Sequence, residues 1–409
     1  MIRSAPLRRL VVAGLIALVV PLAWWLVDRA PDDTWPAEDD TTVTDGALTP
    51  TNGAGRAPGP RGETWTPRSA RVVMGGDLLW HNTVWQAGQA EHRRTGKGIG
   101  GIDLAPVFAD VAETIAGADL AICQEEVPFA GPGEPWQNFP LFAAPPQIAR
   151  WIAQVGFDAC VTASNHSIDQ GYAGLVETAD LLERAGVAHV GTFRTRAERD
   201  RPVLLTTADG VRIGLVAGTY STNGIPLPQG REWSVNSWDP ANLLAQVRAA
   251  RSAGAELVVV HLHGGNEYDP SPNADQIRIV EELTASGEVD LVLGSHAHVV
   301  QPITRVNGVW VVYGMGNMIA QQDPSMPRTY EGILADFTFT EKSPGRFAVS
   351  DASYHPLVWG SWPAAPLRVQ RVVPALAAGR GDRYRLQKAL ERTRAAVHAA
   401  GRTASLHER

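Results

Sequence analysis

Six short apolar runs, each followed closely by polar residues, constrain the fold of this chain more than any other feature of the sequence. Most of the runs are rich in the β-branched residues that favour strands. Amphipathic stretches of helical length lie between several of them, at 146–155, 171–185, 240–253 and 273–285. This alternation predicts an α/β fold around a largely parallel sheet between about residues 70 and 340. The six runs are 71–75, 118–123, 158–162, 257–262, 290–293 and 309–313.

One pair of apolar runs departs from the alternating pattern. The runs 202–207 and 211–217 are separated by three residues that include Asp209-Gly210. An Asp-Gly turn between apolar runs is typical of a β-hairpin, so we expect the sheet to be mixed rather than wholly parallel.

The polar residues beyond the six runs are of the types that bind metal ions. Carboxyl ends of strands converge at one edge of an open α/β sheet, so one metal cluster is the simplest explanation. His296-Ala297-His298 has strand-like spacing, which predicts that both rings point the same way. Any one of these residues alone is better explained as a turn, cap or packing residue. The set comprises Asp77, Gln124, Glu125, Glu126, Asn165, His166, His261, His263, His296, His298 and Asn317, with His81 shortly after Asp77.

Six stretches in chain order, over about residues 70–320, form a set of short motifs. They are Gly76-Asp77, 118–128 (ADLAICQEEVP), 163–171 (ASNHSIDQG), 262–268 (LHGGNEY), 294–302 (GSHAHVVQP) and 313–317 (YGMGN). Together they resemble the motifs of the CapA-type poly-γ-glutamate capsule biosynthesis family, which belongs to the calcineurin-like metallophosphoesterase superfamily.

The resemblance implies a four-layer α/β/β/α sandwich with two divalent metal ions, of Mn, Fe or Zn, at its edge. It implies that His166, oriented by Asp169, acts on the substrate, and that Glu267, Tyr268 and Asn317 contact it. His81 is an alternative ligand, because Leu79 stands where the superfamily has a histidine. The metal ligands implied are Asp77, Glu126, Asn165, His263, His296 and His298.

Two substitutions relative to the family motifs bear on the pocket. Glu125 stands where the family has Leu, and Gly264 stands where it has Trp. They predict a pocket wall that is more open and more acidic than usual.

The N-terminus predicts membrane attachment. An apolar run of 18 residues, 10–27, follows Arg8 and Arg9 and is just long enough to span a bilayer. A cleavable signal peptide is the competing interpretation, but bulky Trp24 and Trp25 stand where small cleavage-site residues are expected. We therefore expect a single-pass anchor at 1–30, a disordered linker rich in Pro, Gly, Thr and Asp at 31–69, an extracytoplasmic domain at 70–340, and an extension of strands and a helix at 341–409.

Composition argues against a nucleic-acid partner, and two classes of function remain. The net charge of −7 shows no basic stripe, so no nucleic-acid partner is expected. Cys123 and Cys160 are expected to be two small buried residues rather than a disulfide. Two function classes remain: a metal-dependent phosphoesterase acting on an envelope polymer or its precursor, and a metal-binding component of a capsule synthesis or export complex that works with membrane proteins without turnover.

Overall fold

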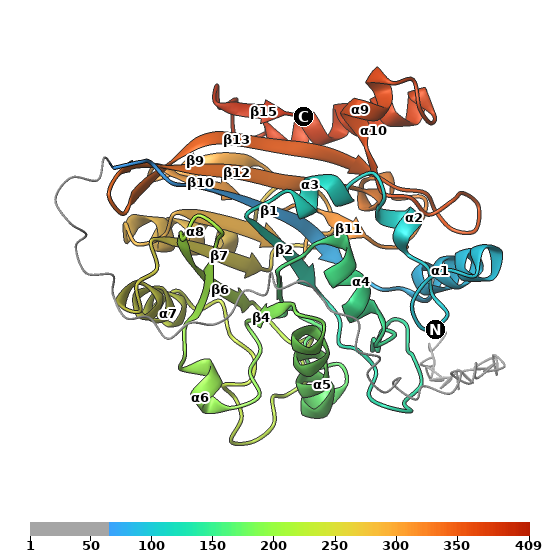
Figure 1. Ribbon diagram of the computed structural model, residues 1–409, viewed down its shortest axis with the longest axis horizontal. Coiled ribbons are helices and arrows are strands. Elements are labelled where there is room, and N and C mark those ends of the chain that lie inside the picture. The colour runs from blue at the N-terminus through green and yellow to red at the C-terminus, as the bar shows by residue number, and fades with distance from the viewer. Residues whose placement is uncertain (1–64) are drawn as a thin grey trace, which may run out of the picture.

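The computed structural model describes residues 65–409, in which two β-sheets lie face to face (Figure 1). The first sheet has nine strands. Its main path runs in the order β14 (Gln370–Arg371), β13 (Arg346–Val358), β12 (Glu331–Ser343), β1 (Ser69–Leu78), β2 (Leu120–Glu125), β3 (Ala159–Val161) and β4 (Ala188–Val190). Two short strands complete it: β11 (Asn317–Ile319) pairs with β1, and β15 (Leu406–Glu408) pairs with β13.

The second sheet has six strands. Their order is β5 (Val203–Thr206), β6 (Arg212–Thr219), β7 (Leu257–His263), β8 (Leu291–Ser295), β10 (Val309–Val312) and β9 (Ile303–Val306). Strands β1 to β4 are parallel in the first sheet, and β6, β7, β8 and β10 are parallel in the second. Each group therefore presents its carboxyl ends together at one edge of its sheet.

Helices of the described chain lie around the two sheets. They are α1 (Asn82–Thr95), α2 (Ala105–Phe108), α3 (Ala112–Ala116), α4 (Ile148–Val155), α5 (Gly171–Arg184), α6 (Arg196–Arg199), α7 (Pro240–Ser252), α8 (Ala274–Ala285), α9 (Val372–Ala377) and α10 (Arg383–Val397), with a 3₁₀ turn, η1, at Pro327–Tyr330. Local sequence fixes where some of them begin: Asn273 and Gln276 form a capping box at α8, and Asp239 caps α7 before Pro240.

Alternation along the strands separates three hydrophobic layers. Between the sheets, Met74 and Ile122 pack with Leu215 and Val259. On the outer face of the first sheet, apolar residues of β1 and β2 pack against α1 to α4. On the outer face of the second, residues of β6 and β7 pack against α7 and α8. The resulting order is helix, sheet, sheet, helix, and the expected mixed α/β fold is confirmed, including the β5–β6 hairpin.

The C-terminal part is more closely built into the fold than an appended extension. β12 runs across residue 340 and pairs with both β1 and β13, so the expected boundary at 340 falls inside a strand of the first sheet. The expected helix in this region is α10, which packs with α9 beyond β13. α1 had no counterpart among the helices predicted above.

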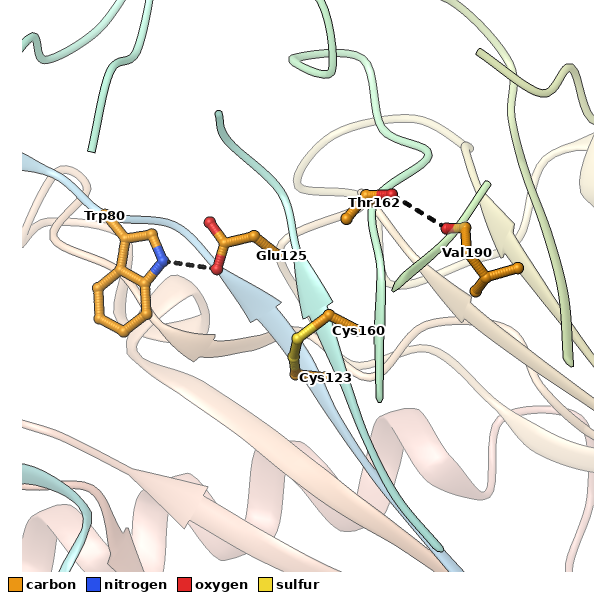
Figure 2. The surroundings of a disulfide bond; sticks show 6 residues. All are labelled: Trp80, Cys123, Glu125, Cys160, Thr162 and Val190. Atoms are coloured by element: carbon orange, nitrogen blue, oxygen red, sulfur yellow. Dashed lines mark hydrogen bonds between the residues drawn. A yellow bond between two sulfur atoms is a disulfide. The ribbon is translucent and has the colours of Figure 1, made fainter. Parts of the chain in front are cut away.

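The two cysteines correct an expectation. Cys123 of β2 lies opposite Cys160 of β3, and their sulfur atoms form a disulfide (Figure 2). Because the two strands are adjacent and in this register, the Cα atoms are 4.4 Å apart, within the range that a disulfide spans. Sequence spacing did not reveal this register.

The predicted anchor at 1–30 and nearly all of the predicted linker at 31–69 lie outside the described residues. Within residues 65–409, no helix combines the length and the apolar character needed to cross a membrane.

Candidate metal centre

Asp77 is the second-last residue of β1, where the strand is tightly packed against its neighbours. A Cβ atom at Gly76 would lie 1.9 Å from the carbonyl oxygen of Gly316, so only glycine fits at position 76. The Asp77 carboxylate is fully buried. Its Oδ2 accepts a hydrogen bond from the main-chain N–H of His296 at 3.2 Å, and its Oδ1 has no hydrogen-bond partner among the described residues.

Glu126 follows β2 and is fully buried with neither carboxylate oxygen hydrogen-bonded within the described chain. Its Oε1 lies 3.8 Å from His263 Nε2 and 3.7 Å from His298 Nε2. Burial raises the pKa of Glu126 well above its usual range, and the nearby Asp77 carboxylate adds to the rise. An unpaired buried carboxylate is costly unless a cation accompanies it, so this position favours a bound positive ion.

His263 is the last residue of β7 and reaches across to the first sheet. Its Nε2 lies 2.7 Å from Asn165 Oδ1, and its Nδ1 lies 3.9 Å from Asp77 Oδ1. Burial lowers the pKa of His263 well below its usual range. The ring is therefore neutral, which is the form that binds metal.

His296 and His298 do not lie in a strand, as their spacing had predicted. β8 ends at Ser295, and the two residues have φ angles of 93° and 56°. Both rings still reach the site, with the His296 ring centroid 5.0 Å from that of His263 and His298 Nδ1 3.3 Å from Asp77 Oδ2. Left-handed backbone, rather than the alternation of a strand, therefore places them.

The two histidines differ electrostatically. Burial lowers the pKa of His296 to about 3. Burial also opposes the charged form of His298, but the carboxylates of Glu126 and Asp77 outweigh it and raise the pKa of His298 to about 10. The surroundings of His298 thus favour positive charge beside these carboxylates.

Two groups of side chains bring their ligand atoms within 4.8 Å of one another. One is Glu126, His263 and His296, and the other is Asp77, Glu126 and His298. Glu126 belongs to both, and Asn165 adds an amide oxygen beside His263. Oxygen and imidazole donors without thiolate suit Mn, Fe or Zn. Together with the unpartnered buried oxygens, this donor set fits bound divalent metal.

A third group, Glu183, His189 and Glu198, is a weaker candidate. The guanidinium of Arg194 hydrogen-bonds both glutamates, so a cation already balances them.

His81 is in neither of the first two groups. Its Nδ1 accepts the main-chain N–H of Gln321 at 3.2 Å, which places the proton of a neutral ring on Nε2. A protonated nitrogen cannot bind a metal, so the contacts do not favour His81 as a ligand.

Asn317, the first residue of β11, contacts His298. It is fully buried, its Oδ1 is 2.9 Å from His298 Nδ1, and its Nδ2 donates to the carbonyl of Thr329. These contacts orient a ligand candidate, and the contact of Asn317 with substrate stays a prediction.

His166 and Asp169 form a hydrogen-bonded pair in the loop after β3. His166 Nδ1 lies 2.7 Å from Asp169 Oδ2, which leaves Nε2 as the ring nitrogen free for other contacts. Ser164 ties this loop to Glu126, because its hydroxyl donates to the Glu126 carbonyl and accepts the main-chain N–H of His166.

The two substituted positions, Glu125 and Gly264, each lie against a tryptophan, and the expected openness and acidity of the pocket wall stay predictions. The Glu125 carboxylate accepts a hydrogen bond from Trp80 Nε1 at 2.9 Å and belongs to neither ligand group (Figure 2). A Cβ atom at Gly264 would lie 2.3 Å from the ring of Trp238. The Trp238 ring thus occupies the space that a side chain at position 264 would take. Glu267 and Tyr268 are exposed, and their contact with substrate stays a prediction.

Asn223 was missed by sequence reasoning. Its Oδ1 accepts a hydrogen bond from Asn165 Nδ2 at 3.2 Å, and its φ angle is 52°. The dipeptide Asn223-Gly224 is a common turn signal with positive φ, so the turn, though not the contact, was detectable. Of the five non-glycine residues with positive φ in the described chain, four lie at this site: Asn223, Tyr268, His296 and His298. Such backbone conformations are commonly concentrated at functional sites.

The fold and the site together define a mixed α/β protein with a candidate metal centre between two sheets. Residues 71–322 match the sequence model of the family described as bacterial capsule synthesis protein PGA_cap, and the chain belongs to this family.

Curated relatives agree with this family. The chain is 26% identical to the PGA biosynthesis protein CapA of Bacillus subtilis over 205 residues, which are 50% of this chain and 53% of that protein. It is 27% identical over 228 residues to a probable polyglutamine synthesis accessory protein of Mycobacterium tuberculosis, covering 52% of this chain and 56% of that one. The chain spans about half the length of the curated relatives it matches.

Solved structures give weaker similarity. A putative 5'-nucleotidase from Staphylococcus aureus has a TM-score of 0.45 at 13% identity, over 72% of this chain and 55% of that one. The calcineurin-like phosphoesterase YfkN of Bacillus subtilis has a TM-score of 0.41 at 12% identity, over 80% and 97% of the two chains.

Proposed function

We propose that this chain is a membrane-anchored, extracytoplasmic phosphoesterase that uses two divalent metal ions in the synthesis of a capsule or envelope polymer of the poly-γ-glutamate type. The environment of Glu126 supports this proposal most directly. The buried Glu126 carboxylate has no hydrogen-bond partner within residues 65–409 and belongs to both ligand groups, which is the arrangement expected of a bridge between two ions.

Each proposed ligand set combines residues from both sheets. Asp77 and His298 would hold one ion with Glu126, and Asn165, His263 and His296 would hold the other with Glu126. Bound divalent ions would supply Lewis-acid stabilisation of phosphoryl oxygens and activation of a water.

The protein's own residues supply proton transfer and orientation. Asp169 holds Nδ1 of His166, so Nε2 is the nitrogen able to give a proton to the leaving-group oxygen. Asn317 holds His298, and Asn223 holds Asn165, so two ligand candidates are orientated by partners outside the ligand groups.

Two observations support the location outside the cytoplasm. The apolar run 10–27 follows arginines, as in a signal anchor. The disulfide between Cys123 and Cys160 is of the kind that persists in oxidising compartments. Sequencing the N-terminus of the mature protein tests the anchor, because a chain that begins after residue 27 would have lost it.

The activity is tested by measuring metal content and phosphate-ester hydrolysis of the purified full chain. We expect two equivalents of metal and hydrolysis that a chelator abolishes. Metal binding without hydrolysis of any phosphate ester or envelope polymer would favour instead a non-catalytic component that works with capsule synthesis or export membrane proteins.

A further inference from the structure

Three consecutive apolar residues, Phe139, Pro140 and Leu141, are exposed at the tip of a loop. Phe139 is 68% exposed and Leu141 is 45% exposed. A run of exposed apolar residues is unfavourable in water and is retained where it serves binding. The position of this tip in the molecule indicates what it binds.

The tip is held in place by an ordered base. Gln137 and Ala143 exchange two main-chain hydrogen bonds of 2.9 and 3.0 Å, and Asn138 Oδ1 accepts the main-chain N–H of Asn82 at 3.1 Å. The tip is therefore a formed surface that does not have to be ordered when a ligand arrives, which lowers the entropic cost of binding.

The loop is joined directly to the His166–Asp169 pair through Phe142. The main-chain N–H of Phe142 donates to Asp169 Oδ2 at 2.9 Å, and that oxygen is also the partner of His166 Nδ1. The buried Phe142 ring meets His166 edge to face, with centroids 5.0 Å apart, and meets Phe139 at 6.3 Å. A continuous aromatic contact therefore runs from the candidate acid to the exposed tip.

We propose that Phe139 and Leu141 form a subsite for a hydrocarbon leaving group, so that the substrate is a phosphate ester of an apolar alcohol. The inference rests on the proposed function, in which His166 faces the leaving-group oxygen. Because Phe142 contacts both His166 and Phe139, the group attached to that oxygen lies within reach of the tip. None of the three tip side chains carries a hydrogen-bond donor or a charge, so the tip is suited to bind a hydrocarbon group rather than a sugar or an anion.

The reaction balances as hydrolysis. The oxygen of a water bonds to phosphorus, and the bond from phosphorus to the leaving oxygen breaks with its electron pair on that oxygen. The leaving oxygen takes a proton from His166 Nε2, and the proton lost by the water passes to solvent, from which His166 is reprotonated. The products are the apolar alcohol and the phosphate.

The test compares phenyl phosphate with 4-butylphenyl phosphate on the metal-loaded full chain. The para butyl group enlarges the leaving group and changes the basicity of the leaving oxygen little. If the subsite buries about half of the surface of each butyl carbon, each of the four carbons should raise kcat/KM about twofold. The kcat/KM for 4-butylphenyl phosphate should then exceed that for phenyl phosphate roughly 16-fold. In the double variant Phe139→Ser/Leu141→Ser the ratio should fall to about 1–2. The matched control is Tyr384→Ser, which removes a side chain that is 71% exposed on α10 and should keep the wild-type ratio.

A binding measurement separates this proposal from the proposed function. Non-hydrolysable phenylphosphonate and 4-butylphenylphosphonate are titrated calorimetrically. If no ester is hydrolysed but the butyl compound binds roughly 16-fold tighter, and the double variant loses the difference, the subsite stands and the phosphoesterase proposal fails. Equal binding and equal kcat/KM for both compounds would overturn the subsite. A further measurement attaches the fluorophore bimane at Leu141→Cys and adds phosphatidylglycerol vesicles. If the two compounds show equal binding and equal kcat/KM, and the bimane emission shifts to the blue, the tip binds a lipid surface instead.

Discussion

Asn165 donates its side-chain amide to Asn223 Oδ1 at 3.2 Å, and this contact turns Asn165 Oδ1 toward His263, 2.7 Å from its Nε2. The partner that fixes a proposed metal ligand therefore comes from a loop 58 residues further along the chain. The orientation of Asn165 depends on a residue that is itself exposed and in the left-handed region.

Replacing this partner should weaken metal binding while preserving the fold. We expect Asn223→Gly to lower metal affinity about 10–100-fold, the usual cost of losing an outer partner of a ligand. Glycine keeps the positive φ angle at no steric cost. Isothermal titration of the metal-free chain with Mn²⁺ or Zn²⁺ measures the change. The control is Asn307→Gly, because Asn307 also has a positive φ of 50° but bonds Thr284, away from the site. Unchanged affinity in Asn223→Gly would show that the contact does not orient Asn165.

His166→Asn should separate catalysis from metal binding. His166 belongs to neither ligand group, so folding and metal content should be retained. Loss of a proton donor typically lowers the rate about 10²–10⁴-fold, which we expect in kcat for a phosphate ester. Metal analysis accompanies the kinetics. If the variant arrives without metal, His166 is a ligand and its role as an acid is wrong.

Metal removal should destabilise the protein, because it leaves the Asp77 and Glu126 carboxylates buried together. Metal at about 100 times its dissociation constant stabilises the folded chain by about 2.7 kcal/mol, so a chelator should lower Tm by on the order of 5 °C. Differential scanning calorimetry of each variant with and without metal measures the shift. His263→Asn should abolish most of it, whereas His81→Asn should keep it. A lost shift in His81→Asn would instead identify His81 as a ligand.

Acid should remove stability through Asp336 on β12. Its carboxylate accepts hydrogen bonds from Arg71 at 2.9 Å and lies 3.0 Å from His355 Nε2. Burial opposes ionisation, but the bonds from His355 and Arg71 outweigh it and lower the pKa of Asp336 from 3.8 to about 2. A carboxyl whose pKa is lowered by folding stabilises the protein above about pH 4 and loses that contribution as the pH falls toward 2.

The corresponding experiment compares wild type with Asp336→Asn by thermal unfolding between pH 5 and pH 2.5. The variant should be less stable at pH 5 and should lose less stability over this range. Parallel curves for the two proteins would contradict the assignment.

Local sequence was sufficient for part of the pattern of elements. The Asp-Gly turn predicts the β5–β6 hairpin because the conformation of a tight turn depends on only a few consecutive residues. Asn273 and Gln276 mark the start of α8 because a capping box is a contact between residues three positions apart. The local sequence pattern did not predict α1. Only four residues of this helix are buried: Val84, Trp85, Ala87 and Gly88.

The sequence by itself determined which residue types stand beyond the strands, and hence Asp77, Glu126, Asn165, His263, His296 and His298 as candidates. It also carried the family resemblance, because motifs are local. Tertiary structure alone decided the pairing of Cys123 with Cys160, which depends on strand register, and the placing of Trp238 beside Gly264. It also decided that Asn317 supports His298 and that left-handed backbone aims His296 and His298. Such contacts join residues far apart in the chain or depend on backbone angles, and periodicity in a sequence reports only which face of an element each residue occupies.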